Sequence, residues 1–194
     1  MKKLLIATTN SDKFKLTSAL IKLSGFDGFE FFCLKDIDYS GDDVVESGEI
    51  SERAKQKAQV CFKNVGGKFD FVVGIDDGII IKNQIHENVK DYVPKIIKGE
   101  CLADGEQVFI ARAYHFVSSE GKEYHEVTKI PFIYKPADHE IEIKPHSYPL
   151  SQVFYALDYD VPVSAMNKLD EDAYTLKYSK PYLSEILKQI KTTD

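Results

Sequence analysis

The stretch LLIATTNSDK, residues 4–13, decides the fold that we predict for this chain. Its apolar start, LLIA, is short enough for a buried strand, and the polar residues after it are typical of a turn. The apolar side chains of the next segment, residues 14–23, recur at helical spacing: Leu16, Ala19, Leu20 and Leu23. Gly25 is placed to end that helix. The sequence therefore predicts a strand, a polar turn and a helix in direct succession.

The predicted turn has two interpretations. The N–H groups of a helix N-terminus lack intrahelical partners and the helix dipole is positive there, so the turn could bind an anion. Thr8 and Asn10 add polar side chains, and Lys13 adds a full positive charge. In the other interpretation Thr9 and Asp12 form a capping box, and Lys13 is only solvated.

Composition limits the class of protein. The chain has 194 residues, of which 43% are hydrophobic, enough for a single domain spanning 1–194 with a full core. Its net charge of −6 argues against broad binding to nucleic acid or to anionic membranes. An anionic substrate would therefore need a local cationic cluster or a metal ion.

Cysteine use and hydropathy indicate a cytoplasmic protein. The three cysteines are odd in number and show no motif spacing, as expected of reduced thiols. No apolar run is long enough for a signal peptide or for a membrane-spanning helix. We expect a protein with no membrane partner.

A second helix is predicted over residues 50–65, after a loop that contains Asp42 and Asp43. Its apolar residues keep helical spacing: Ile50, Ala54, Ala58, Cys61 and Val65. Lys57 borders this apolar face, where a lone lysine is usually a snorkelling side chain.

A buried strand, residues 69–75, then runs into Asp76, Asp77 and Gly78, and residues 79–81 are again apolar. An Asp-Gly pair between two apolar segments is a strong signal for a hairpin turn. Two adjacent carboxylates in so apolar a setting are also costly unless a cation compensates them, and Mg²⁺ accepts carboxylate oxygens together with phosphates. Both interpretations remain open from the residues alone.

The remaining chain alternates β-like and helical patterns. We expect a short or broken helix within residues 86–98, and a β-rich lobe at about 105–145 that includes the alternating HEIEIK, 139–144. Residues 169–178 look helical, and Pro181 introduces a final, separate helix.

Taken together, these segments resemble the inosine triphosphate (non-canonical purine nucleoside triphosphate) pyrophosphatase family. The family pattern T-x-N-x-x-K after the first strand is matched by Thr8, Asn10 and Lys13. Its second pattern, E-N-A-x-x-K-A, is matched by ERAKQKA at 52–58, with Arg53 in place of the asparagine.

The third family pattern is an acidic pair followed by a small hydroxyl residue. Asp76 and Asp77 match it, with Gly78 at the hydroxyl position. Each motif alone is weak, and their order over residues 4–81 gives the resemblance its strength.

The family's base-recognition segments are altered in this chain. The aromatic that stacks on the base corresponds to Tyr148, and the aspartate of the same segment to Ser151. The S-H-R triplet becomes Thr175, Leu176 and Lys177. The resemblance thus implies that the residues that bind the phosphates are kept and that the residues that recognise the base are changed.

The resemblance implies an α/β fold: a central mixed sheet flanked by helices, with the β-rich second lobe forming a cleft. It also implies Mg²⁺-dependent hydrolysis of a nucleoside triphosphate to the monophosphate and pyrophosphate by a homodimer, with altered base specificity. Lys13 and Lys57 would contact phosphates, and Asp76 or Asp77 would act as the base. The metal ligands implied are Asp77, Asp76, Asp42 and Asp43.

Two other hypotheses remain. A protein of the same fold could bind nucleotides without turnover, because the same phosphate loop would serve it equally well. An unrelated α+β domain could use the first turn as a helix cap and the Asp-Gly pair as a hairpin.

Overall fold

A computed structural model of the chain describes five segments: residues 1–37, 39–41, 47–86, 88–141 and 149–193. Its α-helices are α1 (Ser11–Leu23), α2 (Ile50–Val65), α3 (Val89–Ile97) and α4 (Lys168–Thr193). Its strands are β1 (Lys2–Ile6), β2 (Phe29–Cys33), β3 (Phe71–Ile81), β4 (Gln84–His86), β5 (Gln107–Ser118), β6 (Glu123–Tyr134) and β7 (Phe154–Ala156). Three short 3₁₀ turns complete the set: η1 (Gly66–Lys68), η2 (Pro149–Gln152) and η3 (Val163–Ala165).

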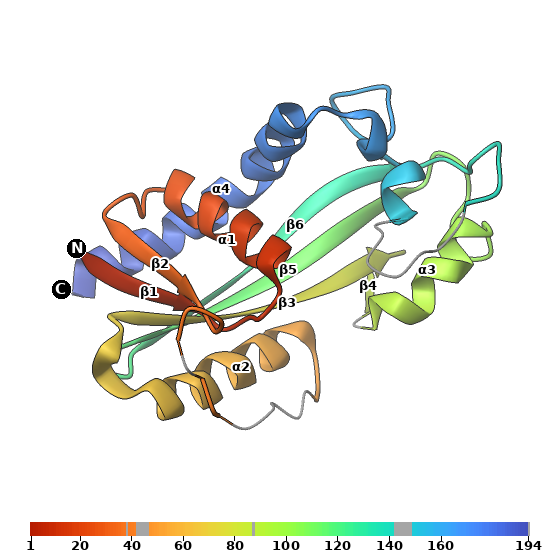
Figure 1. The fold of residues 1–194 in the computed structure, drawn as a ribbon. Helices are drawn as coiled ribbons and strands as arrows, with labels where there is room; N and C mark the ends of the chain where they lie inside the picture. The colour runs from red at the N-terminus through yellow and green to blue at the C-terminus, as the bar shows by residue number, and fades with distance from the viewer. Residues whose placement is uncertain (38, 42–46, 87, 142–148, 194) are drawn as a thin grey trace. The chain divides into compact units, whose positions relative to one another are not determined.

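The strands form one mixed sheet of seven, in the order β2-β1-β3-β5-β6-β7, with β4 paired to β3 (Figure 1). β1 pairs in parallel with β2 and β3, whereas β4 is antiparallel to β3, and β7 is antiparallel to β6. The predicted α/β fold with a mixed sheet and flanking helices is confirmed. No helix of the described residues is long and apolar enough to span a bilayer.

The chain divides into two compact units. Unit 1 holds Met1–Asp76, Arg112–Thr128 and Ser179–Asp194, and unit 2 holds Asp77–Ala111 and Lys129–Tyr178. The predicted β-rich lobe at about 105–145 therefore contributes to both units. The single domain and the cleft both stay predictions.

In unit 1, α1 and α2 lie on opposite faces of the sheet (Figure 1). The predicted apolar face of α2 is confirmed, since all five of its residues are buried. The predicted face of α1 is wrong at two positions, because Ala19 is exposed and Leu23 is 55% exposed. The helix instead buries Thr17, Leu20 and Ile21. A pattern that counts only apolar residues misses this face, because the buried Thr17 is polar.

The Asp-Gly pair does not form a turn. β3 runs unbroken through Asp76, Asp77 and Gly78, so the hairpin interpretation is wrong. The chain reverses into β4 at Lys82 and Asn83, whose φ angles of 50° and 63° are the left-handed values that a tight two-residue hairpin requires.

Two predictions near the C-terminal half need correction. Pro181 does not start a separate helix, because α4 is continuous from Lys168 to Thr193 with the proline inside it. The strand predicted at 139–144 is wrong at 139–141, which have no strand structure, and 142–144 lie outside the described residues. The short helix predicted within 86–98 is confirmed as α3, with Pro94 inside it.

Unit 2 has its own core. Phe132 of β6 stacks on Phe154 of β7, with ring centroids 5.7 Å apart, and packs against Tyr174 of α4 at 5.6 Å. All three side chains are buried. This aromatic contact joins the strand pair β6–β7 to the helix.

Candidate functional site

Two of the predicted motifs belong to adjacent parallel strands: the polar turn follows β1, and the acidic pair lies within β3. Ile6, the last residue of β1, is level with Val73 of β3, and the N–H of Ala7 donates to the carbonyl oxygen of Val73 at 2.8 Å. The polar turn that begins at Thr8 follows directly, and Asp76 lies three residues beyond Val73. The connection from β1 to β2 runs through α1 on one face of the sheet, and the connection from β2 to β3 runs through α2 on the other face. The boundary between β1 and β3 is therefore a topological switch point, where α/β sheets usually bind ligands.

The turn after β1 caps helix α1. The Oδ1 atom of Asn10 accepts hydrogen bonds from the N–H of Asp12 at 2.9 Å and of Lys13 at 3.0 Å. Thr8 accepts through Oγ1 from the N–H of Asn10 at 3.2 Å. Asn10 is therefore the N-cap, and the capping box predicted from Thr9 and Asp12 is wrong. An anion at this helix end would compete with Asn10 for two N–H groups.

Gly74 sets how closely β3 approaches α2. A Cβ atom built on Gly74 would lie 1.9 Å from the carbonyl oxygen of Ala54 and 2.6 Å from the nitrogen of Ala58. Only glycine permits such an approach of strand to helix. Side chains two residues apart in a strand share a face, so Asp76 points toward α2 as well.

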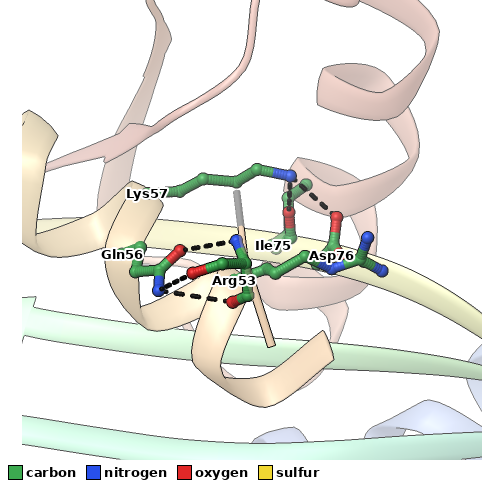
Figure 2. Close-up of polar contacts among 6 residues, drawn as sticks. Arg53, Gln56, Lys57, Ile75 and Asp76 are labelled. Atoms are coloured by element: carbon green, nitrogen blue, oxygen red, sulfur yellow. Dashed lines mark hydrogen bonds and ion pairs between the residues drawn. The ribbon is translucent and has the colours of Figure 1, made fainter. Parts of the chain in front are cut away.

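On that face, Asp76 is held by two cations from α2 (Figure 2). The Nζ atom of Lys57 lies 2.7 Å from Oδ1 of Asp76, and Nη2 of Arg53 lies 2.7 Å from Oδ2. Lys57 also approaches the carbonyl oxygen of Ile75 at 3.5 Å. The exposed fraction is 9% for the Asp76 side chain and 16% for each cation. A carboxylate so buried is stable as an anion only with such compensation.

The sequence patterns give Arg53 no functional role and mark it only as a departure from the family's asparagine. The signal was present in its spacing, because residues four apart lie on one helix face and Lys57 already bordered the buried stripe. The spacing of residues along α2 cannot show that Asp76 of β3 lies opposite the helix face that carries Arg53 and Lys57.

The residues present do not fit a resident magnesium ion at the acidic pair. Asp76 and Asp77 are consecutive in β3, so their side chains point to opposite faces of the sheet. Both oxygens of Asp76 already contact cations. Within the segments that the structure describes, no three His, Cys, Asp or Glu side chains are grouped closely enough to hold a metal ion. Asp42 and Asp43 lie outside the described residues.

The residues predicted to recognise the base fall in unit 2. Tyr148 lies outside the described residues, Ser151 is half-buried in η2, and Thr175 is half-buried in α4. Lys177 of α4 forms an ion pair with Asp158, with Nζ and Oδ2 2.6 Å apart. The hydrogen bond to Asp158 raises the pKa of Lys177. Its charge is therefore shared with a carboxylate.

The fold is shared with solved structures of known proteins. A nucleoside-triphosphatase (dITP/XTP pyrophosphatase) from Mycobacterium abscessus matches with a TM-score of 0.60 and 17% identity, over 91% of this chain and 94% of that one. The Ham1 protein of Staphylococcus aureus matches with a TM-score of 0.70 and 11% identity, over the full length of both chains. A HAM1 protein from Coxiella burnetii gives 0.65 and 14%, also over both full lengths.

No family model matches the sequence, and no curated protein matches it by sequence comparison. At these identities the structural matches establish the fold alone. The fold implied by the sequence resemblance is thus confirmed, and the activity has to be argued from the residues.

Proposed function

We propose that this protein is a nucleoside-triphosphate pyrophosphatase that hydrolyses a nucleoside triphosphate to the monophosphate and pyrophosphate. The observation that carries the proposal is that two motifs belong to neighbouring parallel strands. The turn with Lys13 follows the end of β1, whose last residue pairs with Val73, and Asp76 with its partner Lys57 lies three residues further along β3. A triphosphate is strongly anionic, so a nucleophilic water can approach only where cations neutralise it.

The roles follow from the contacts. Lys13 and Lys57 contact the phosphates, and Thr8 and Asn10 hold the turn in shape through the cap. The resemblance implies Asp76 or Asp77 as the general base, and we keep Asp77 in that role. Asp76 contacts cations through both oxygens and serves as their counter-ion. Magnesium dependence enters the proposal through the substrate, since Mg²⁺ binds readily to phosphates while keeping several waters.

Base specificity is proposed to differ from that of inosine triphosphate pyrophosphatases. Leu176 offers no hydrogen bond, Ser151 is short and uncharged, and Lys177 lacks the planar fork of arginine. A site without such groups discriminates weakly, because a wrong base leaves no buried polar group unpaired. We expect similar kcat/KM values for several nucleotides, and a preference of about 10²-fold for ITP and XTP would contradict this.

The decisive experiment measures pyrophosphate release from a panel of ITP, XTP, dITP and the four common nucleotides, each with Mg²⁺. The Asp77→Asn change keeps the shape of the side chain and should lower the rate by about 10²-fold or more. Asp91→Asn, an exposed position on α3, is the matched control and should leave the rate unchanged. Near-parental turnover by Asp77→Asn would refute the assignment of the base.

One observation favours a second candidate, a nucleotide-binding protein without turnover. The engagement of Asp76 by Arg53 and Lys57 removes one carboxylate of the pair from chemistry. Thermal stabilisation by nucleotides without pyrophosphate release would support this candidate. Homodimer formation and a cytoplasmic location complete the proposal, and light scattering tests the first.

A further inference from the structure

The three side chains Arg53, Lys57 and Asp76 form one cluster, which we call the α2–β3 cluster. All three belong to unit 1, and the two cations are four residues apart on one face of α2. Two positive charges and one negative charge leave these side chains with a net charge of +1. Neither cation is sealed from solvent, since 16% of each side chain is exposed.

We infer that the α2–β3 cluster binds the polyphosphate chain directly, with Arg53 as a phosphate-contacting residue and Asp76 as its fixed counter-ion. The inference rests on the proposed function. It adds Arg53 as a substrate-binding residue, and it assigns the compensation of the Asp76 charge to side-chain cations in place of a metal ion. A divalent cation at Asp76 would stand beside two positive charges already 2.7 Å from its oxygens. Coulomb repulsion at such separations opposes its entry.

The chemistry of Arg53 suits this role. A guanidinium keeps its charge at every physiological pH and presents five donors in a planar fork, which matches phosphate oxygens. Asp76 holds Arg53 in place before an anion arrives, so less side-chain entropy is lost on binding. The close packing of Gly74 against Ala54 fixes the strand that carries this counter-ion.

Binding of inorganic tripolyphosphate to the full-length protein in EDTA, measured by calorimetry, tests the inference without any turnover. We expect binding without metal, weakened roughly 10-fold or more by Arg53→Gln and much less by Arg53→Lys, which keeps the charge. Lys55→Gln is the matched control. It removes the same charge from α2, but beside His115 and Glu123, and should change the affinity by less than about twofold.

The Asp76→Asn change distinguishes the two roles of Asp76 by the direction in which the affinity for tripolyphosphate changes. If Asp76 is a counter-ion, the change raises the net charge of the cluster and tightens tripolyphosphate binding in EDTA. If Asp76 held a metal, binding would need Mg²⁺ and the change would abolish it. Circular dichroism establishes that each variant is folded. If Asp76→Asn does not fold, the comparison of Arg53→Gln with Lys55→Gln decides.

The inference is overturned by binding that occurs only with Mg²⁺, by loss of binding in a folded Asp76→Asn protein, or by equal effects of Arg53→Gln and Lys55→Gln. These outcomes are separate from the proposed function. Tripolyphosphate binding with no pyrophosphate release from any nucleotide would refute the enzyme and leave the cluster as an anion site. Turnover that persists in Arg53→Gln with unchanged tripolyphosphate affinity would refute the inference alone.

Discussion

Gly74 of β3 lies directly against the backbone of Ala54 in α2, so closely that a Cβ atom would stand 1.9 Å from the alanine carbonyl oxygen. This contact lets Asp76, two residues along the strand, meet Arg53 and Lys57. The absence of a side chain at Gly74 therefore sets the distance between β3 and α2 on which the charge cluster depends.

Replacing Gly74 with alanine should force α2 away from β3. The neighbouring atoms are backbone and cannot rotate away, so we expect a loss of about 1–3 kcal/mol in the free energy of unfolding, and weaker tripolyphosphate binding. Urea unfolding measures the first quantity. Gly28→Ala is the matched control, because a Cβ there meets nothing within 4 Å. Equal stability of the two variants would contradict the packing argument.

Cys61 lies on the same buried face of α2 and should be chemically inert in the folded protein. Burial raises the pKa of its thiol to about 12, so roughly 10⁻⁴ of it is thiolate at pH 8. Iodoacetamide labelling followed by mass spectrometry should modify the half-buried Cys101 first and Cys61 only on unfolding. Native-state labelling of Cys61 as fast as that of Cys101 would show that α2 opens readily.

His115 of β5 should make folding stability sensitive to acid. Burial lowers the pKa of His115, opposed by attraction to Glu123 of β6, while His125 and Lys55 lower it further. The folded pKa lies below the unfolded value of about 6.5, so the unfolded chain takes up the proton first. The contribution of His115 is therefore present above about pH 6.5 and is lost as the pH falls toward the folded pKa.

His115→Gln should accordingly reduce the loss of stability between about pH 7.5 and about pH 5.5, measured by urea unfolding. His139→Gln is the control of opposite sign, because a hydrogen bond to Asp138 raises the pKa of the exposed His139. Its replacement should slightly steepen the same loss. An unchanged pH dependence in His115→Gln would show that this histidine does not govern the acid response.

The hydroxyl of Tyr174 ties α4 to two parts of unit 2. It donates to the carbonyl oxygen of Pro131 and accepts from the N–H of Leu157 at 3.0 Å. Tyr174→Phe leaves both groups without this partner, and we expect a loss of about 1–3 kcal/mol in the free energy of unfolding. Tyr182→Phe, at a side chain that is 38% exposed, should cost less than about 0.5 kcal/mol. Thermal unfolding compares the two.

The sequence alone determined the elements whose pattern is local. β1, the polar turn and α1 follow one another as residues 4–23 predict, and the apolar stripe of α2 is buried at every predicted position. Periodicity suffices there because helices and strands present their side chains at fixed intervals. The same periodicity failed at α1, where Thr17 occupies a buried position that a hydrophobic pattern does not count.

Only the tertiary structure decided how the charges are arranged. In the sequence, the Asp-Gly pair in 76–78 signals a turn and Arg53 is a mismatch in a motif. In the structure, Asp76 lies inside a continuous strand and both of its oxygens contact cations from α2. The physical reason is that β3 pairs with strands far away in the chain, which overrides the local turn preference. The glycine at 74 then brings Asp76 within reach of a helix some twenty residues earlier.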